Sequence, residues 1–226
     1  MTFLRTAWLV MKKDLVIEAR SKEIVYTTVF FAVACVLVFA FGFVKEGRPV
    51  ADAASGILWI AIAFSGTLAL GRAFERERQS ETLRALLIAP IDRPALYLGK
   101  LGGVLLLLAA VEAIVVPLVA LMFQAPLFAR PWLMIGLLAA GTLGFAAVGT
   151  LFAAMLVRAR SRDVLLPVLL YPITIPVIIA GVRGTAALLQ PEIDEPMARL
   201  WLSMLVFFDV VFVTLALWTF EPLMTE

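Results

Sequence analysis

The chain has 226 residues and a mean hydropathy of +1.02, with 63% hydrophobic residues and only 16% charged residues. Soluble domains carry about 25% charged residues, so this composition excludes an ordinary soluble domain. The formal net charge of +2 gives no evidence for a nucleic-acid partner.

Six apolar runs dominate the sequence, and each is close to the length of about 20 residues that spans the hydrocarbon core of a bilayer. None of them shows the alternating pattern of barrel strands, so the spans are predicted to be helical. We therefore expect an all-α membrane protein, with one membrane domain over residues 1–226. The predicted spans are residues 25–44, 53–70, 101–123, 132–157, 164–182 and 201–220.

The segment before the first span, residues 3–22, is amphipathic. Phe3, Ala7, Met11 and Leu15 recur every four residues, while most charged residues fall elsewhere around the helix. This pattern predicts an interfacial helix along the cytoplasmic leaflet, with Trp8 at the depth of the headgroups. The alternative is a charged leader that only sets the topology. No small-residue cleavage site follows a short apolar core, so we expect no cleavable signal peptide.

The basic residues predict the orientation. Fourteen Lys and Arg residues fall in the segments before the first span, between the second and third spans and between the fourth and fifth. Five fall on the other side of the membrane. Because cytoplasmic loops carry the excess of Lys and Arg, both termini are predicted to be cytoplasmic.

The loop between the second and third spans is the most polar part of the chain. Residues 72–84 carry seven charges in thirteen positions, so this loop must lie in water. Ser80 is a suitable N-cap, Leu83, Leu86 and Leu87 share one face, and Pro90 ends the pattern. The sequence predicts a short amphipathic helix over residues 80–89, on a surface suited to a soluble partner.

The fifth span contains three prolines, Pro167, Pro172 and Pro176. Each removes a hydrogen bond from a helix interior, so this span is predicted to be kinked or broken. Two interpretations stay open, because such a span either moves and lines a pathway or holds a static kink.

Two acids and a tyrosine within the spans are candidates for a functional site. Glu112 and Asp209 fall near the middle of the third and sixth spans, and Tyr171 falls in the fifth. A charge at this depth costs about 2.5 kcal/mol or more, so these acids are expected to face the bundle interior or to be protonated. They mark either a substrate or proton path or a hydrogen-bonded internal contact.

Several kinds of chemistry are missing from the sequence. The chain has no histidine and one cysteine, Cys35, so we expect no metal site and no bound cofactor. No phosphate-binding loop is present, since Gly99-Lys100 lacks the flanking residues of that motif. If ATP drives this protein, another polypeptide binds it, and this chain is not an enzyme.

The order of interfacial helix, six spans and charged helix after the second span resembles the type-2 ABC exporter permeases. In that family the charged helix is the coupling helix, which docks on the ATPase subunit. The matching residues here are Glu75, Arg76, Glu77, Arg78, Glu81, Thr82, Leu83, Leu86, Leu87 and Pro90. Glu81 departs from the pattern, because a glycine is common before Thr-Leu.

A closer resemblance, over nearly the whole chain, is to the haem exporter B family of the cytochrome c maturation system. It rests on Gly56-Ile57-Leu58-Trp59, on the proline-rich stretch from Leu166 to Val177, and on Phe208-Asp209-Val210-Val211-Phe212 with Phe220-Glu221.

The resemblance implies a bacterial inner-membrane complex, with ATP and Mg on an ABC ATPase subunit and with two permeases paired with two ATPases. It also implies a haem-handling membrane subunit, a small accessory subunit and a periplasmic haem chaperone. The complex would either export haem as its cargo or release the haem-loaded chaperone. The alternatives are a permease of another type-2 exporter (drug, lipid or polysaccharide), an ion-coupled carrier using Glu112 and Asp209, or a structural scaffold.

Overall fold

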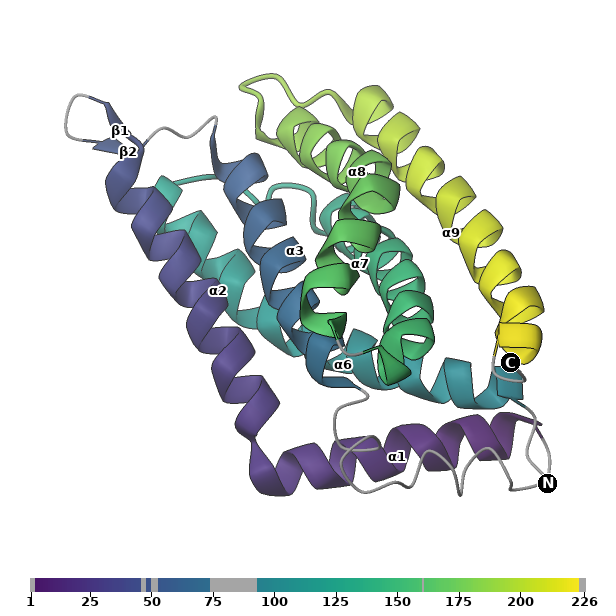
Figure 1. Cartoon of the computed structure of the whole chain (residues 1–226). Helices are drawn as coiled ribbons and strands as arrows, with labels where there is room; N and C mark the ends of the chain where they lie inside the picture. Colours follow the sequence, from purple (N-terminus) through teal and green to yellow (C-terminus); the bar gives the residue numbers. More distant parts are fainter. Residues whose placement is uncertain (1–2, 46–47, 50–52, 74–92, 160, 224–226) are drawn as a thin grey trace.

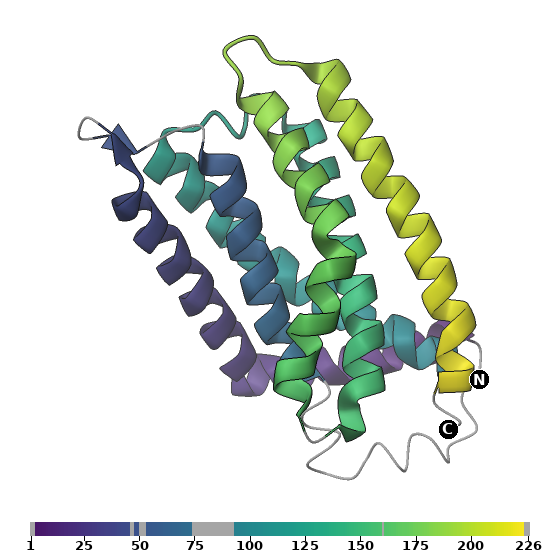
Figure 2. The ribbon, with the colours of Figure 1, turned by 45° about the horizontal axis from the view of Figure 1, so that its top comes forward.

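The structure is a computed structural model that describes residues 3–45, 48–49, 53–73, 93–159 and 161–223. Within these ranges, six helices are long and apolar enough to cross a membrane. They stand side by side as a bundle, and a seventh helix, α1, lies across one end of it (Figures 1 and 2). The predicted all-α membrane fold with six spans is confirmed.

The helix α1 (Phe3–Ser21) buries Thr6 and Val10, and the first span, α2 (Glu23–Gly42), follows after the single residue Lys22. The remaining spans are α3 (Ala54–Ala73), α6 (Arg93–Phe123), α7 (Pro131–Met155), α8 (Arg162–Leu189) and α9 (Glu195–Leu223). A 3₁₀ helix, η2 (Leu156–Arg158), follows α7. Beyond α2, the short strands β1 (Val44–Lys45) and β2 (Arg48–Pro49) pair antiparallel, with Val44 opposite Pro49 and Lys45 opposite Arg48.

The described ends of the chain lie at one end of the bundle. The beginning of α1 and the carboxyl end of α9 are close together there, and the β1–β2 hairpin and the α8–α9 connection lie at the opposite end (Figure 1). An even number of spans requires this arrangement. It agrees with the topology predicted from the basic residues.

The described spans differ from their predicted bounds, most of all in the third, fifth and last spans. The third span was expected from residue 101, but α6 begins at Arg93. Pro94 is compatible with this early start because the first turn of a helix does not use its N–H groups. The last span was expected from residue 201, but α9 begins at Glu195. There Asp194 Oδ1 accepts a hydrogen bond of 3.0 Å from the Met197 N–H, the contact that an N-cap residue makes.

The fifth span was predicted to be kinked or broken, and the structure rules out the break. Pro167, Pro172 and Pro176 all lie inside one continuous helix, α8, which runs to Leu189 rather than residue 182. Membrane helices tolerate proline where Ser or Thr side chains and neighbouring helices compensate the backbone. The Thr174 hydroxyl donates to the Leu170 carbonyl at 2.9 Å between the second and third prolines, but the carbonyls that these two prolines leave without a donor are those of Val168 and Pro172.

The central helix of the bundle is α7. It packs against α3, α6, α8 and α9, and glycine and alanine residues along it permit close approach. Two clusters of buried apolar side chains surround it. The cluster toward the β1–β2 end includes Trp59, Val115 and Leu137, and the cluster toward the α1 end includes Leu70, Tyr97 and Phe145.

Candidate functional site

The residues predicted to couple to an ATPase, Glu75 to Pro90, lie outside the described residues. The structure does describe the two helices that enter and leave this segment, α3 and α6. Their ends at the α1 side of the bundle therefore define which helices flank the segment of residues 74–92.

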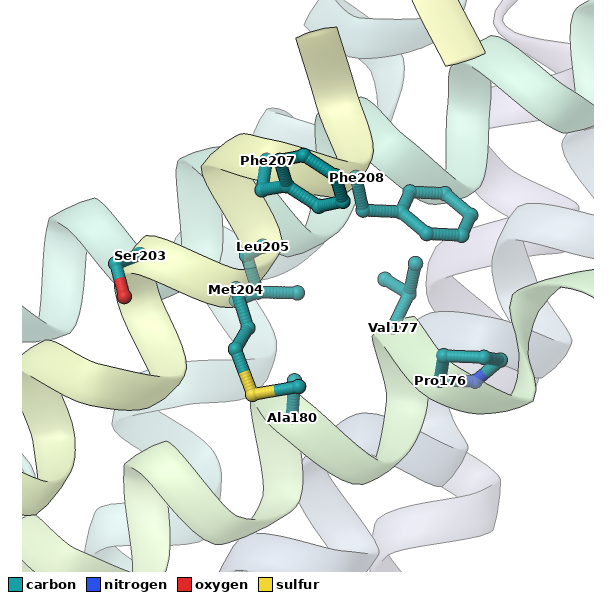
Figure 3. Close-up of a pocket in the computed structure, with 8 residues that line it drawn as sticks. All are labelled: Pro176, Val177, Ala180, Ser203, Met204, Leu205, Phe207 and Phe208. Atoms are coloured by element: carbon teal, nitrogen blue, oxygen red, sulfur yellow. The ribbon is translucent and has the colours of Figure 1, made fainter. Parts of the chain in front are cut away.

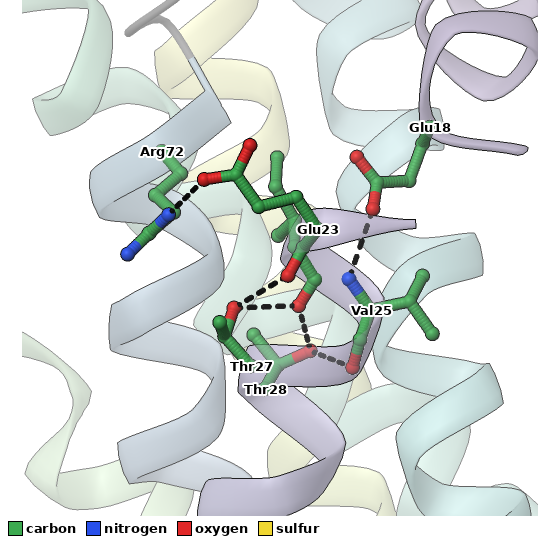
Figure 4. A network of polar contacts seen from close by, with 7 residues as sticks. Glu18, Glu23, Val25, Thr27, Thr28 and Arg72 are labelled. Carbon is green, nitrogen blue, oxygen red and sulfur yellow. Dashed lines mark hydrogen bonds and ion pairs between the residues drawn. The ribbon is translucent and has the colours of Figure 1, made fainter. Parts of the chain in front are cut away.

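The carboxyl end of α3 is joined to the start of α2. Arg72 Nη1 lies 2.9 Å from Glu23 Oε1, as Figure 4 shows. Both side chains are largely exposed, so the ion pair contributes only about 0–1 kcal/mol to stability. Its importance is positional, because Arg72 is close to the end of α3 and Glu23 is the first residue of the first span.

The corner between α1 and α2 is held by a second carboxylate. Lys22 adopts the left-handed conformation with φ of 55° and accepts a backbone hydrogen bond from Tyr26. Glu18 Oε1, on the last turns of α1, accepts a hydrogen bond of 2.9 Å from the Val25 N–H (Figure 4). A side chain thus satisfies one of the free N–H groups at the start of α2. This contact connects the orientation of α1 to the first span.

The start of α6 is anchored more firmly. Tyr97 is fully buried and its hydroxyl donates a hydrogen bond of 3.0 Å to the Ala147 carbonyl on α7. Its ring lies against Phe220 near the end of α9, with the ring centres 5.3 Å apart. Arg93 Nη1 also donates to the Glu221 carbonyl at 3.2 Å. The start of α6, which follows the segment of residues 74–92, is therefore fixed to both α7 and α9.

The contact of α1 with α6 includes a buried ion pair that the sequence did not predict. Lys100 Nζ lies 2.8 Å from Asp14 Oδ2, and the Lys100 side chain is only 3% exposed. The neighbouring Gly99 allows close approach, because an added Cβ would lie 2.7 Å from the Ala7 carbonyl oxygen. The predicted third span begins one residue after Lys100. In the structure, Lys100 lies inside α6 and contacts α1 through Asp14.

The first intramembrane acid, Glu112, accepts a hydrogen bond from the Thr142 hydroxyl of α7. Both residues are about 16 Å of helix from the same end of the bundle, at about 1.5 Å per residue. Because α6 and α7 are adjacent and antiparallel, Glu112 and Thr142 lie at the same depth in the bundle and can contact each other. Glu112 is therefore a hydrogen-bonded internal residue, and this geometry neither requires nor excludes a pathway.

The second acid, Asp209, is 6% exposed and faces α7 at Gly144. Its Oδ1 has no hydrogen-bond partner among the described residues. A Cβ on Gly144 would lie only 2.6 Å from this oxygen, so the glycine makes room for the carboxyl. Thr142 and Gly144 are two residues apart and point in nearly opposite directions from a helix. Glu112 and Asp209 thus approach α7 from opposite sides and form no common site.

The third polar residue, Tyr171, lies between α3 and α8. Its hydroxyl oxygen accepts a hydrogen bond of 3.1 Å from Thr67, and its ring meets Phe64 edge-on at 6.1 Å. Tyr171 follows directly before Pro172, so the proline-containing helix is held to α3 at this level. The contact accounts for Tyr171 without a ligand.

Trp59 packs tightly against glycines of two other helices, and this packing was not predicted. Its indole fits between Gly141 on α7 and Gly181 on α8, where an added Cβ would lie 2.1 Å and 2.4 Å from ring atoms. Its Nε1 donates a hydrogen bond of 3.0 Å to Thr185 Oγ1. The residues that surround the indole belong to α7 and α8, far from Trp59 in the sequence, so no local pattern could have indicated this packing.

At the opposite end of the bundle, an ion-pair cluster joins α7 to α9. Arg130 Nε lies 2.5 Å from Glu195 Oε1, and Arg199 Nη2 lies 3.3 Å from Glu195 Oε2.

Within the described ranges, no group of three or more Cys, Asp or Glu residues is arranged to hold a metal ion. The polar residues of this chain therefore mainly connect helices.

The comparisons with known proteins agree with this architecture. A model of the family described as "CcmB protein" matches residues 5–222. A protein of Rhodobacter capsulatus named "Heme exporter protein B" is 34% identical over 181 residues, which are 76% of this chain and 78% of that protein. Proteins of the same name from Paracoccus denitrificans and Pseudomonas aeruginosa are 32% and 28% identical, over 69% and 82% of this chain and 70% and 82% of their own lengths. The chain belongs to the CcmB protein family.

Proposed function

We propose that this chain is the membrane-spanning permease subunit of an ABC transporter complex that serves cytochrome c biogenesis in a bacterial inner membrane. A partner ATPase subunit binds ATP and Mg, and this chain contributes no catalytic residue. Both termini and residues 72–92 face the cytoplasm. The family match over residues 5–222, the six apolar helices and the distribution of basic residues support this proposal.

The observation that carries the coupling part of the proposal is the attachment of the cytoplasmic loop at both ends. Tyr97 fixes the start of α6 to α7 and α9, and Arg72 pairs with Glu23 at the start of α2. A displacement of the loop by an ATPase would therefore reach α2, α7 and α9. Such direct mechanical attachment is what a permease needs in order to respond to a partner.

The path continues through α3. Trp59 is inserted between α7 and α8, so α3 cannot shift along either helix without moving the indole out of its glycine-lined seat. Packed interfaces of this kind change between discrete arrangements rather than deform gradually. A load that enters α3 from the cytoplasmic loop is thereby transmitted to the centre of the bundle.

Two versions of the reaction remain within this proposal. In one, haem is the cargo; in the other, ATP hydrolysis releases a haem-loaded periplasmic chaperone from a haem-handling membrane subunit. The chain contains no histidine, the commonest proximal haem ligand, which supports the second version. Two permeases, two ATPases and a small accessory subunit complete the proposed complex.

An ion-coupled carrier receives less support. Such a carrier needs carboxylates that face a common path, whereas Glu112 and Asp209 approach α7 from opposite sides. A permease for drugs, lipids or polysaccharides would share the architecture and differ in its role. Removing the chain distinguishes this permease from one that serves cytochrome c biogenesis, because the cell would lose a different function in each case.

The test is a chromosomal deletion in the source bacterium, complemented by the full chain. We expect holocytochromes c to disappear from haem-stained gels while apocytochrome synthesis and b-type haem proteins persist, and complementation to restore them. Normal holocytochrome levels in the deletion strain would overturn the proposed role in cytochrome c biogenesis. Dissipating the proton gradient briefly, with ATP maintained, should leave turnover intact and so distinguishes the permease from an ion-coupled carrier.

A further inference from the structure

A cavity of about 360 Å³ lies between α8 and α9. This volume is within the range of about 300–1,000 Å³ found for small-molecule sites. Figure 3 shows the two helices and the side chains around the empty space. The lining residues are Pro176, Val177, Ala180, Ser203, Met204, Leu205, Phe207 and Phe208.

The lining selects for an apolar ligand. Ser203 carries the only hydroxyl in it, and that hydroxyl already donates to the Leu200 carbonyl at 2.7 Å. Met204 and Phe207 are 50% and 72% exposed, and both lie within the span α9. At this depth the exposed side of the cavity faces hydrocarbon rather than water. A ligand therefore enters from the bilayer and must dissolve in it.

A hydrogen-bond acceptor lies directly behind the inner wall of this cavity. Asp209 Oδ1, the Phe208 ring and the Val177 side chain converge on Gly144, at 2.6, 3.1 and 3.3 Å from the position of an added Cβ. Phe208 and Val177 also line the cavity, so two of its wall residues lie beside this carboxyl. The oxygen is buried and has no partner among the described residues. An unpaired carboxyl oxygen in a span is strongly favoured to acquire a donor.

We propose that the α8–α9 cavity is a binding site for a lipophilic amine, whose apolar part fills the cavity and whose ammonium group reaches Asp209 past the edge of the Phe208 ring. An ammonium group at Asp209 would stabilise the ionised carboxyl by a charge-assisted hydrogen bond, whereas an alcohol or an acid of the same shape offers no such ion pair, so an amine is the preferred ligand. The site consists of residues of this chain alone. It does not depend on the proposed coupling to an ATPase.

The experiment uses the full chain in native membranes with its complex intact. Two photoreactive probes are compared, a dodecylamine and a dodecanoic acid that carry the same aliphatic diazirine. Labelled peptides are quantified by mass spectrometry. Labelling of α8 and α9 is divided by labelling of Trp132 on α7, whose side chain is 84% exposed and lies outside the cavity. This ratio corrects for the different partitioning of the two probes.

We expect the amine to exceed the acid by about tenfold at the cavity, the factor that a hydrogen bond between charged groups typically carries. Asp209→Asn should abolish this preference. Glu112→Gln, which changes a carboxyl at similar depth on the other side of α7, should leave the preference unchanged. Equal labelling by the two probes in the unmodified chain, or an unchanged ratio in Asp209→Asn, would overturn the proposal.

A second variant keeps the test decisive if Asp209→Asn does not accumulate. Ala180→Leu adds three carbon atoms inside the cavity without changing any charge. We expect it to lower labelling by the amine at least to the level of the acid. Undiminished amine labelling of Val177 and Met204 in this variant would show that the cavity is not where the amine binds. Because neither readout depends on ATP, this failure is distinct from failure of the proposed transport function.

Discussion

Trp59 Nε1 donates a hydrogen bond of 3.0 Å to Thr185 Oγ1 and thereby joins α3 to α8 in the interior of the bundle. The bond positions an indole that occupies the space over Gly141 and Gly181. Three spans therefore meet at one side chain. Since α3 leads into the segment of residues 74–92, we expect a load on that segment to reach the other spans at this meeting point.

Gly141→Ala should destabilise the protein by about 1–3 kcal/mol, as overpacked cores do. Its new methyl group would lie 2.1 Å from Trp59 Cη2 if nothing moved. Gly56→Ala is the matched control, because an added Cβ there has no neighbour within 4 Å. Thermal unfolding in detergent, followed by size-exclusion chromatography, compares the two variants. Equal melting temperatures would show that the indole is not tightly packed.

Asp14→Asn should loosen α1 from the bundle, at a cost of about 1–3 kcal/mol, because it leaves Lys100 beside a neutral partner in a nearly closed environment. Lys13→Gln is the control, since Lys13 contacts the same carboxylate at 3.1 Å but is 42% exposed. Its effect should stay within about 0.5 kcal/mol. Protease accessibility of the α1–α2 corner measures the loosening. A larger effect of Lys13→Gln than of Asp14→Asn would contradict the assignment.

Thr142→Val should lower stability by about 1 kcal/mol, because hydrogen bonds between membrane helices contribute about 0.6 kcal/mol on average and Glu112 would lose its donor. Glu112→Gln keeps an oxygen that can accept from Thr142, so we expect holocytochrome c levels to be retained. Haem-stained gels and thermal unfolding report the two effects separately. Loss of maturation in Glu112→Gln at normal protein levels would favour a proton path through this residue.

Asp209→Asn should impair cytochrome c maturation while the complex still assembles. The amide has nearly the same shape as the carboxyl, so the packing against Gly144 is preserved while the charge is lost. Holocytochrome c yield per assembled complex is the measurement. Full activity of the variant would reduce Asp209 to a structural residue.

The fold could be predicted from the sequence because the bilayer imposes length and continuous hydrophobicity on each span. The ends of the spans were less predictable, since polarity alone did not reveal that Lys100 is buried by Asp14 or that Arg183 lies within a helix that continues to Leu189. The three prolines of α8 were predicted to kink or break it, because the sequence does not show which neighbouring groups satisfy the backbone carbonyls that the prolines leave without a donor.

Contacts between helices that are distant in the sequence could not be predicted at all. The seat of Trp59 is made by glycines 82 and 122 positions further along the chain, and only the folded bundle brings them together. The same holds for Tyr97, whose partner Ala147 offers a backbone carbonyl with no signature in the sequence. The predicted coupling residues lie outside the described ranges, so their role stays a prediction.

Isolation of the chain from its native membrane, together with whatever binds it, tests the central claim most directly. The account predicts that a nucleotide-binding subunit co-purifies in stoichiometric amount and hydrolyses ATP. It also predicts that Leu86→Asp, on the apolar face of the expected coupling helix, releases that subunit or abolishes holocytochrome c formation while the six spans stay inserted. Ser80→Ala, which removes only the predicted N-cap, should weaken the association less. Purification of the intact chain without any nucleotide-binding subunit, or normal association and maturation in Leu86→Asp, would contradict the account.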